Sequence, residues 1–576
     1  MNRIDFPRLP KSTSAGLALL ATALLTVPPG VLAEDKTPPR LVLQITVDQL
    51  RGDLPARYLE RMGEGGFRYL LNEGVVYRDA HHAHAMTETI VGHTTLATGA
   101  YPAEHGLIGN VWYDRATGAL IYNVEDARYP LLTAGADVDR STEVDPTQRL
   151  ARSEGRSPAS MLVSTFGDEL AVHTAGAAKV FGVSVKDRGA VSMAGHAGKA
   201  FWFSKAQQEF VTSSFYYDAY PAWVTKFNSG RPGERYANTR WTLMQERENY
   251  LYGEHDDQSW EVSIGDFGRT FPHAYGSSDH PYFATYLTIS PAGDEITVAF
   301  AKRLMAEEDI GQDAVTDYLS VSLSSVDYVG HMFGASSLES EDTLLRLDRT
   351  LADLLAYVDD TVGLEHTLVV LSADHGGPEA PPALNEYGQA TQYVNTDAWD
   401  REAGIEALKV RFGLGGELIS QFFQPYVYLN RTAIAEAGLD LAEVELAVAE
   451  ELLKFEGVAH AIPSHRVMSG ELSDTKLHRL VTNSHNPRRS GDVFVVFEPQ
   501  WFINDFDGLN VATTHGSPWV YDTYVPVIFA GYGLPAQSVS RAIETTSVAS
   551  TLSALVGTNR PSGARGEVLR EVLGED

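Results

Sequence analysis

The stretch Leu41-Val-Leu-Gln-Ile-Thr-Val47 is mostly apolar, and Asp48 follows it directly. Similar short apolar runs recur along the chain. Strands of a parallel sheet that is covered on both faces are apolar over their whole length, so these runs predict a buried parallel sheet. The further runs are Val180–Val185, Tyr318–Val326, Thr367–Leu371, Val493–Phe497 and Val525–Phe529.

Helical patterns lie between the predicted strands, and apolar residues recur at helical spacing in 293–308 and 343–358. Alternating strands and helices predict an α/β fold that is doubly wound, with a mostly parallel central sheet and helices on both faces. Two regions, about 200–285 and about 378–490, break the alternation. We expect both to be insertions into one domain at 34–576, because the chain of 576 residues exceeds the usual domain size.

Residues 1–33 are typical of an export signal. Basic residues precede a short apolar run at 15–27, and small residues follow at 31–33. The run is too short for a membrane-spanning helix, which needs about 20 apolar residues. The sequence therefore predicts a signal peptide that is cleaved after Ala33, a periplasmic mature protein and no membrane anchor.

The composition limits which ligands and partners the protein can bind. The chain contains 44% hydrophobic residues and no cysteine, so a bound zinc ion could use only His and carboxylate ligands. The formal net charge is −31 at pH 7, which argues against a nucleic-acid partner because such proteins present a basic face. An anionic substrate gains nothing from this overall field, so any anion site must be a local group of positive charges.

Asp and His side chains follow several of the predicted strands, where α/β proteins bind their ligands. A single Asp in such a position is usually a turn former or helix cap, but the set together suits metal. Carboxylate and imidazole without thiolate favour zinc. Six ligands are too many for one tetrahedral ion and suit two, which at about 4 Å apart can promote phosphoryl transfer. The six are Asp48, Asp327, His331, Asp374, His375 and His515.

The stretch Thr89-Ile-Val-Gly-His-Thr-Thr-Leu-Ala-Thr-Gly99 supplies a candidate nucleophile. Helix-compatible residues follow Thr89, which places its hydroxyl at a predicted helix N-terminus, where anions are favoured. A hydroxyl bound to zinc can lose its proton and attack phosphorus. Thr89 could also be only a helix cap, and the two roles are compatible.

Six motifs, in this order along the chain, resemble the Thr-nucleophile branch of the alkaline phosphatase superfamily. They are similar to the periplasmic alkaline phosphatases of the phosphate-irrepressible type. The resemblance extends from about Leu41 to the C-terminal region. The motifs are Thr89–His93, Pro102–Asn110, Lys186–Ala190, Asp327–His331, Asp374–Gly377 and Thr513–Pro518.

The resemblance implies a two-zinc catalytic domain in which Thr89 is the nucleophile. It also implies three further residues that contact the phosphoryl group. The implied ligands are Asp327, His331 and His515 for one ion, and Asp48, Asp374, His375 and Thr89 for the other; the implied phosphoryl contacts are Asn110, Lys186 and Arg188.

Lys186 and Arg188 indicate which kind of phosphate ester the protein would bind. Two cations at positions i and i+2 of a strand point the same way. They could bind the extra negative charge that a phosphate monoester carries over a diester. Together with this pair, the resemblance implies an enzyme that hydrolyses small phosphate monoesters with broad specificity, through phosphothreonine, and releases inorganic phosphate. We also expect a monomer. The alternatives are a phosphodiesterase or nucleotide pyrophosphatase on the same scaffold, and a non-catalytic metal-binding protein.

Overall fold

The computed structural model describes residues 37–574, and the predicted signal peptide at 1–33 lies outside them. Within the described residues, the central sheet has nine strands: β1 (Leu41–Val47), β2 (Val75–His81), β7 (Val180–Ser184), β8 (Lys199–Ser204), β9 (Glu209–Val211), β12 (Asp317–Leu323), β13 (Thr367–Ser372), β20 (Val527–Gly531) and β21 (Gln537–Glu544). Their order across the sheet is β21-β2-β20-β13-β1-β12-β7-β8-β9.

Most neighbouring strands run parallel. β1 pairs in parallel with β12 and β13, β12 with β7, β7 with β8, and β2 with β21. β20 runs antiparallel to both β13 and β2, and β9 runs antiparallel to β8. The sheet is therefore mixed but mostly parallel, and the predicted α/β class is confirmed.

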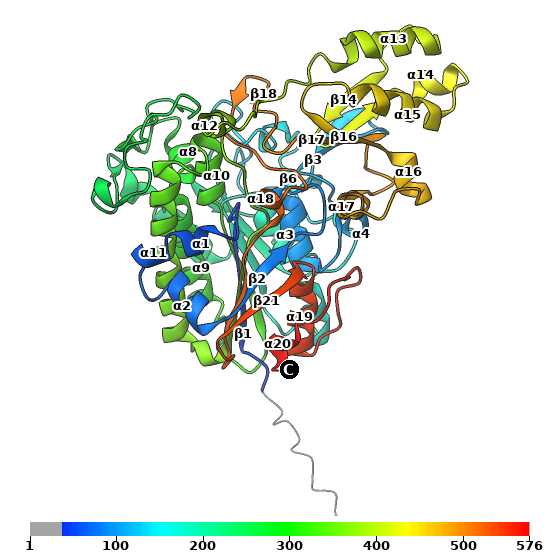
Figure 1. Ribbon diagram of the computed structural model, residues 1–576. Coiled ribbons are helices and arrows are strands. Elements are labelled where there is room, and N and C mark those ends of the chain that lie inside the picture. The colour runs from blue at the N-terminus through cyan, green and yellow to red at the C-terminus, as the bar shows by residue number, and fades with distance from the viewer. Residues whose placement is uncertain (1–36, 575–576) are drawn as a thin grey trace, which may run out of the picture. The chain divides into compact units, whose positions relative to one another are not determined.

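Helices cover both faces of this sheet, with α9 and α11 on one side and α3 and α19 on the other (Figure 1). Successive residues of β1 point to opposite faces: Leu43 belongs to the core shared with α9 and α11, and Val42 to the core shared with α5 and α19. The main helices are α2 (Phe67–Glu73), α3 (Thr89–Thr98), α5 (Phe166–His173), α6 (Asp187–Ala194), α9 (Ala292–Glu307), α10 (Ser325–Phe333), α11 (Leu338–Thr361) and α19 (Ser547–Val556).

The apolar run Val493–Phe497 was expected in the central sheet, and this expectation is wrong. It forms β17 in a separate antiparallel sheet of order β14-β15-β17-β16, which has its own core. Helices from the same region surround this sheet (Figure 1). The elements are β14 (Ile419–Phe423), β15 (Tyr426–Leu429), β16 (Val458–Pro463), β17 (Val493–Phe497), α13 (Ala403–Phe412), α14 (Arg431–Glu436), α15 (Leu441–Leu452), α16 (Ser464–Ser469) and α17 (Lys476–Ser484).

The region at about 200–285 begins inside the central sheet, because β8 and β9 belong to it. The rest forms short elements, among them α7 (Ala222–Ser229), β10 (Arg240–Trp241), β11 (His273–Ala274) and α8 (Phe283–Thr288). This segment is tied to α11 through Asp342, which accepts hydrogen bonds from Nε1 of Trp241 at 2.6 Å and from the hydroxyl of Tyr250 at 2.5 Å. Between residues 37 and 574, no helix is both long enough and apolar enough to cross a membrane.

Candidate active site

Four neighbouring parallel strands end beside the candidate residues. β13, β1, β12 and β7 lie next to one another in this order. Asp374, Asp48, Asp327 and Lys186 follow their carboxyl ends. Ligands of α/β proteins bind beyond this end of the sheet. The sheet therefore brings together side chains that lie far apart in the sequence.

One group of possible metal ligands consists of Asp327, His331 and His515. Asp327 and His331 are one turn apart in α10, and His515 lies in the loop before α18 (Val520–Thr523). Nε2 of His331 and Nε2 of His515 lie 3.3 Å and 3.4 Å from Oδ1 of Asp327. Their Nδ1 atoms donate to the backbone carbonyls of Thr513 and Thr87, each at 2.7 Å. Both rings are thus held with Nε2 facing the carboxylate.

The second group surrounds His375. Its Nε2 lies 3.4 Å from Oδ1 of Asp48 and 3.5 Å from Oδ2 of Asp374, and its Nδ1 donates to the carbonyl of Gly376 at 2.8 Å. Ligand atoms of Asp48, Asp327 and His375 all lie within 4.8 Å of one another. The resemblance implied Asp374 as a ligand of this second ion and assigned Asp327 to the first ion only. In this structure Asp327 lies close to both groups.

The two groups suit bound cations. On all three histidines Nδ1 carries the hydrogen, because a carbonyl oxygen can only accept, and Nε2 is left to hold a proton or a metal ion. Oδ1 of Asp48, Oδ1 of Asp327 and Nε2 of His375 are buried and have no hydrogen-bond partner among residues 37–574. A buried polar atom without a hydrogen-bond partner raises the free energy of the folded protein. A cation between them would satisfy all three, and these ligand types fit zinc.

The charges of the site favour bound positive charge. Burial alone would lower the pKa of His375, but the neighbouring carboxylates, Asp374 foremost, outweigh it and raise that pKa to about 9. Burial would raise the pKa of Asp327, yet the charge of His331 and other cations hold it well below its ordinary value. The carboxylate therefore stays ionised, and a metal ion can replace the protons that it attracts.

Thr89 is the first residue of α3 and is fully buried. Nη2 of Arg188 donates to its Oγ1 at 3.3 Å. Nδ1 of His93 donates to the Thr89 carbonyl at 2.8 Å and lies 3.0 Å from Oδ2 of Asp374. A Cβ on Gly92 would lie 1.8 Å from the Asp374 carbonyl oxygen. Helix α3 can approach the loop of Asp374 this closely only because residue 92 has no side chain.

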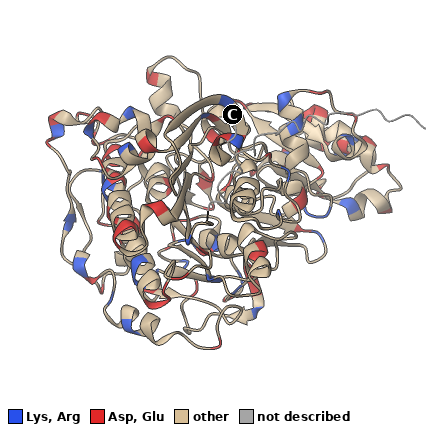
Figure 2. Ribbon diagram, turned by 90° about the horizontal axis from the view of Figure 1, so that it is seen from below, with Lys and Arg blue, Asp and Glu red and all other residues tan. Residues whose placement is uncertain are grey.

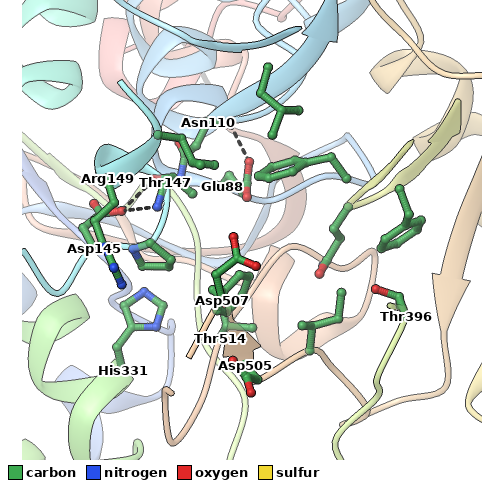
Figure 3. A pocket seen from close by; sticks show the side chains of 18 of the residues that line it. Glu88, Asn110, Asp145, Thr147, Arg149, His331, Thr396, Asp505, Asp507 and Thr514 are labelled. Carbon is green, nitrogen blue, oxygen red and sulfur yellow. Dashed lines mark hydrogen bonds between the residues drawn. The ribbon is translucent and has the colours of Figure 1, made fainter. Parts of the chain in front are cut away.

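A pocket of about 330 Å³ adjoins these groups and is lined by Arg188, Asn110, His331 and His515. Its outer walls come from residues 145–150, from β14 and from the hairpin of β18 (Asp505–Phe506) and β19 (Leu509–Asn510). Figure 3 shows Asn110 on one side of the pocket and Asp505 on the opposite side. This volume is in the range of small-molecule sites.

Lys186 and Arg188 do not lie on a strand, contrary to the expectation. β7 ends at Ser184, Lys186 is the N-cap residue of α6, and Arg188 lies in the first turn of that helix. Only Arg188 lies inside the helix, so the rule for alternate strand residues does not apply, and the two cations have different partners. Nη1 of Arg188 pairs with Oδ2 of Asp145 at 2.7 Å. Nζ of Lys186 pairs instead with two of the candidate metal ligands.

Sequence reasoning missed two buried carboxylates, Glu88 and Asp145. Oε2 of Glu88 accepts from the backbone N–H of Asn110 at 2.5 Å, and burial raises the pKa of Glu88 to about 7. Its position directly before the α3 start was an available signal, since acidic groups favour helix N-termini. Oδ1 of Asp145 is held by the backbone N–H of Thr147 at 2.9 Å, and no spacing in the sequence relates Asp145 to Arg188.

The fold and the site define an α/β protein with a candidate two-metal centre beside a small-molecule pocket. Comparison with known proteins identifies its family. Residues 42–518 match the family model described as type I phosphodiesterase / nucleotide pyrophosphatase. A protein of Myroides odoratus named calcium-transporting ATPase is 33% identical over 94% of this chain and 96% of its own.

Two further relatives are named alkaline phosphatases. PhoV of Synechococcus elongatus is 32% identical over 95% of each chain. PafA of Elizabethkingia meningoseptica is 32% identical over 95% of this chain and 97% of its own. A crystal structure of wild-type PafA matches with a TM-score of 0.82 and 31% identity, covering 93% of this chain and 99% of that one. This chain therefore belongs to the alkaline phosphatase family that includes PafA and PhoV.

Proposed function

We propose that this protein is a zinc-dependent alkaline phosphatase that hydrolyses phosphate monoesters with broad specificity and releases inorganic phosphate. That it is a phosphoric monoester hydrolase follows from its family. The finer proposal adds two zinc ions, a phosphothreonine intermediate at Thr89, a monomeric state and export to the periplasm with cleavage after Ala33.

The observation that carries the proposal is the contact of the α3 start with both candidate ligand groups. The Thr87 carbonyl accepts from His515 at 2.7 Å, and His93 lies 3.0 Å from Oδ2 of Asp374. Thr89 lies between these two contacts in the sequence. The residue that carries the candidate nucleophile is thus flanked by one contact to each group that would hold metal.

Zinc, when bound, would supply a Lewis acid that lowers the pKa of a hydroxyl and neutralises developing charge. Oγ1 of Thr89 attacks phosphorus, the new O–P bond forms as the bond to the leaving alcohol breaks, and the alcohol leaves with the proton that Thr89 gives up. Water then hydrolyses the phosphothreonine and restores the hydroxyl. Arg188 and Asn110 donate to the phosphoryl oxygens in both steps, with Lys186 as a third implied contact.

A solved variant of PafA supports this assignment. It carries substitutions of one threonine, one asparagine, one lysine and one arginine. The separation of that threonine from the asparagine equals that of Thr89 from Asn110, and the separation of the lysine from the arginine equals that of Lys186 from Arg188. Each of these two pairs of residue types therefore recurs here with the same spacing inside the pair.

A phosphodiesterase or nucleotide pyrophosphatase is the second candidate, because the matching family model carries that name. A diester has about one negative charge fewer than a monoester near neutral pH, so the guanidinium beside Thr89 favours monoesters.

The test compares p-nitrophenyl phosphate with bis(p-nitrophenyl) phosphate. We expect the wild type to prefer the monoester, and Arg188→Ala to lose at least about tenfold more kcat/KM on the monoester than on the diester, because a charge-assisted contact is lost. Arg149→Ala is the matched control, since Arg149 lines the same pocket and should leave the preference intact. A wild type that prefers the diester would overturn the proposal.

A further inference from the structure

Lys186 forms ion pairs with candidate metal ligands, which a side chain that only contacts substrate would not need. Its Nζ pairs with Oδ2 of Asp48 at 2.6 Å and with Oδ2 of Asp327. All three side chains are buried, with at most 1% of each exposed. One ammonium group therefore joins two candidate metal ligands, one at the end of β1 and the other in α10.

The two carboxylates divide their oxygens in the same way. Oδ2 of each faces Lys186, whereas Oδ1 of each faces an imidazole Nε2, at 3.4 Å for Asp48 and His375 and at 3.3 Å for Asp327 and His331. The space between each Oδ1 and Nε2 is where the ligand atoms converge for a metal ion. Lys186 pairs with the other oxygen of each carboxylate, so it can stay paired while metal binds at Oδ1.

We propose that Lys186 is the built-in counter-ion of the metal-free centre, stabilising the folded protein before metal binds and weakening the affinity for metal by its charge. This inference rests on the proposed function in that the metal is taken to be zinc. Taking away the ammonium that pairs with two buried carboxylates is strongly destabilising. A divalent ion bound at the Oδ1 atoms of the same carboxylates is repelled by the ammonium.

Stabilisation of the metal-free protein and repulsion of the metal ion both lower the measured affinity for zinc. Removing the lysine raises the free energy of the metal-free folded state more than that of the zinc-bound state, in which zinc neutralises the carboxylates. Whatever destabilises only the metal-free state appears as tighter zinc binding. A role limited to the substrate would change KM or kcat but would leave zinc affinity and the stability of the metal-free protein unchanged.

Lys205 provides a matched control. Its Nζ lies 4.8 Å from the centre of the Tyr328 ring, the same distance as Nζ of Lys186, and its side chain is also buried at 8% exposure. Its ion-pair partner is Glu143, which is not one of the candidate metal ligands. Lys205→Met therefore removes a buried ammonium from the same ring without touching Asp48 or Asp327.

The experiment uses full-length mature protein stripped with EDTA and measures two quantities for the wild type, Lys186→Met, Lys186→Arg and Lys205→Met. The first is the thermal midpoint in EDTA, and the second is zinc affinity in competition with a chromophoric chelator. We expect Lys186→Met to unfold at a lower temperature in EDTA and to bind zinc at least about tenfold more tightly than the wild type. Lys205→Met and Lys186→Arg should keep the wild-type affinity.

Unchanged or weaker zinc binding by Lys186→Met would overturn the proposal, as would an equal gain in Lys205→Met or in Lys186→Arg. Failure of Lys186→Met to fold even in excess zinc, while Lys205→Met folds, would also overturn it, because zinc should replace the missing charge. A wild type that binds no zinc contradicts the proposed function as well. A zinc-binding wild type with unchanged affinity in Lys186→Met contradicts only this inference.

Discussion

At the scale of single residues, the site depends on which atom of each side chain faces its neighbour. The histidines are fixed by hydrogen bonds from Nδ1 to carbonyl oxygens, which leaves Nε2 toward the carboxylates. Thr89 was predictable because its position at a helix start is visible in the pattern that follows it. Asp145 was not, because its function is to hold Arg188, and that contact is created only by the fold.

Thr89→Ala should reduce turnover of p-nitrophenyl phosphate by at least about a thousandfold, because the nucleophile is lost. It should also abolish the phosphorylated peptide that contains residue 89, as measured by mass spectrometry after acid quenching. Thr89→Ser keeps a hydroxyl and should retain the labelled peptide. Normal turnover by the alanine variant would remove Thr89 from the mechanism.

At the scale of elements, strand ends and one close helix contact assemble the site. The run Leu41–Val47 was assigned correctly because a buried parallel strand is apolar throughout and its carboxyl end carries Asp48. Val493–Phe497 has the same apolar character but pairs in the second sheet, and composition cannot distinguish two sheets that are both buried. Lys186 and Arg188 were misplaced on a strand because β7 ends before them.

Gly92→Ala tests the contact between α3 and the loop of Asp374. The added Cβ would lie 1.8 Å from the Asp374 carbonyl oxygen, so the helix or the loop must move. We expect kcat/KM to fall by about 100-fold, since displacements of about 1 Å in an active site have effects of this size.

The control for this variant is Gly416→Ala, at a glycine with no heavy atom within 4 Å of an added Cβ among the described residues. It should retain wild-type kcat/KM. Full activity in Gly92→Ala, with an unchanged thermal midpoint, would show that the close approach of α3 is not needed for catalysis.

At the scale of the whole molecule, acidic residues prevail and yet the site must bind an anion. The formal net charge is −31, and Figure 2 shows Asp and Glu distributed over the helices with Lys and Arg among them. Substrate binding therefore depends on local cations rather than on the overall field. The acidic composition could be read from the sequence, but which cations lie beside the site could be seen only in the folded structure.

Removal of metal should affect stability as well as activity. Zinc present at about a thousand times its Kd would stabilise the folded protein by about 4 kcal/mol, if it binds only that state. We expect EDTA to abolish activity and lower the thermal midpoint, and added zinc to restore both. Circular dichroism should show that the EDTA-treated protein remains folded, because Lys186 still pairs with Asp48 and Asp327. Full activity after complete removal of zinc, verified by elemental analysis, would contradict this expectation.

The most direct test of the central claim is the anomalous diffraction of crystals grown with zinc, recorded on both sides of the zinc absorption edge. The account predicts two zinc peaks about 4 Å apart, one among Asp327, His331 and His515 and the other beside Asp48, Asp374 and His375, with Oγ1 of Thr89 next to the second. A single peak, or two peaks away from Thr89, would contradict it.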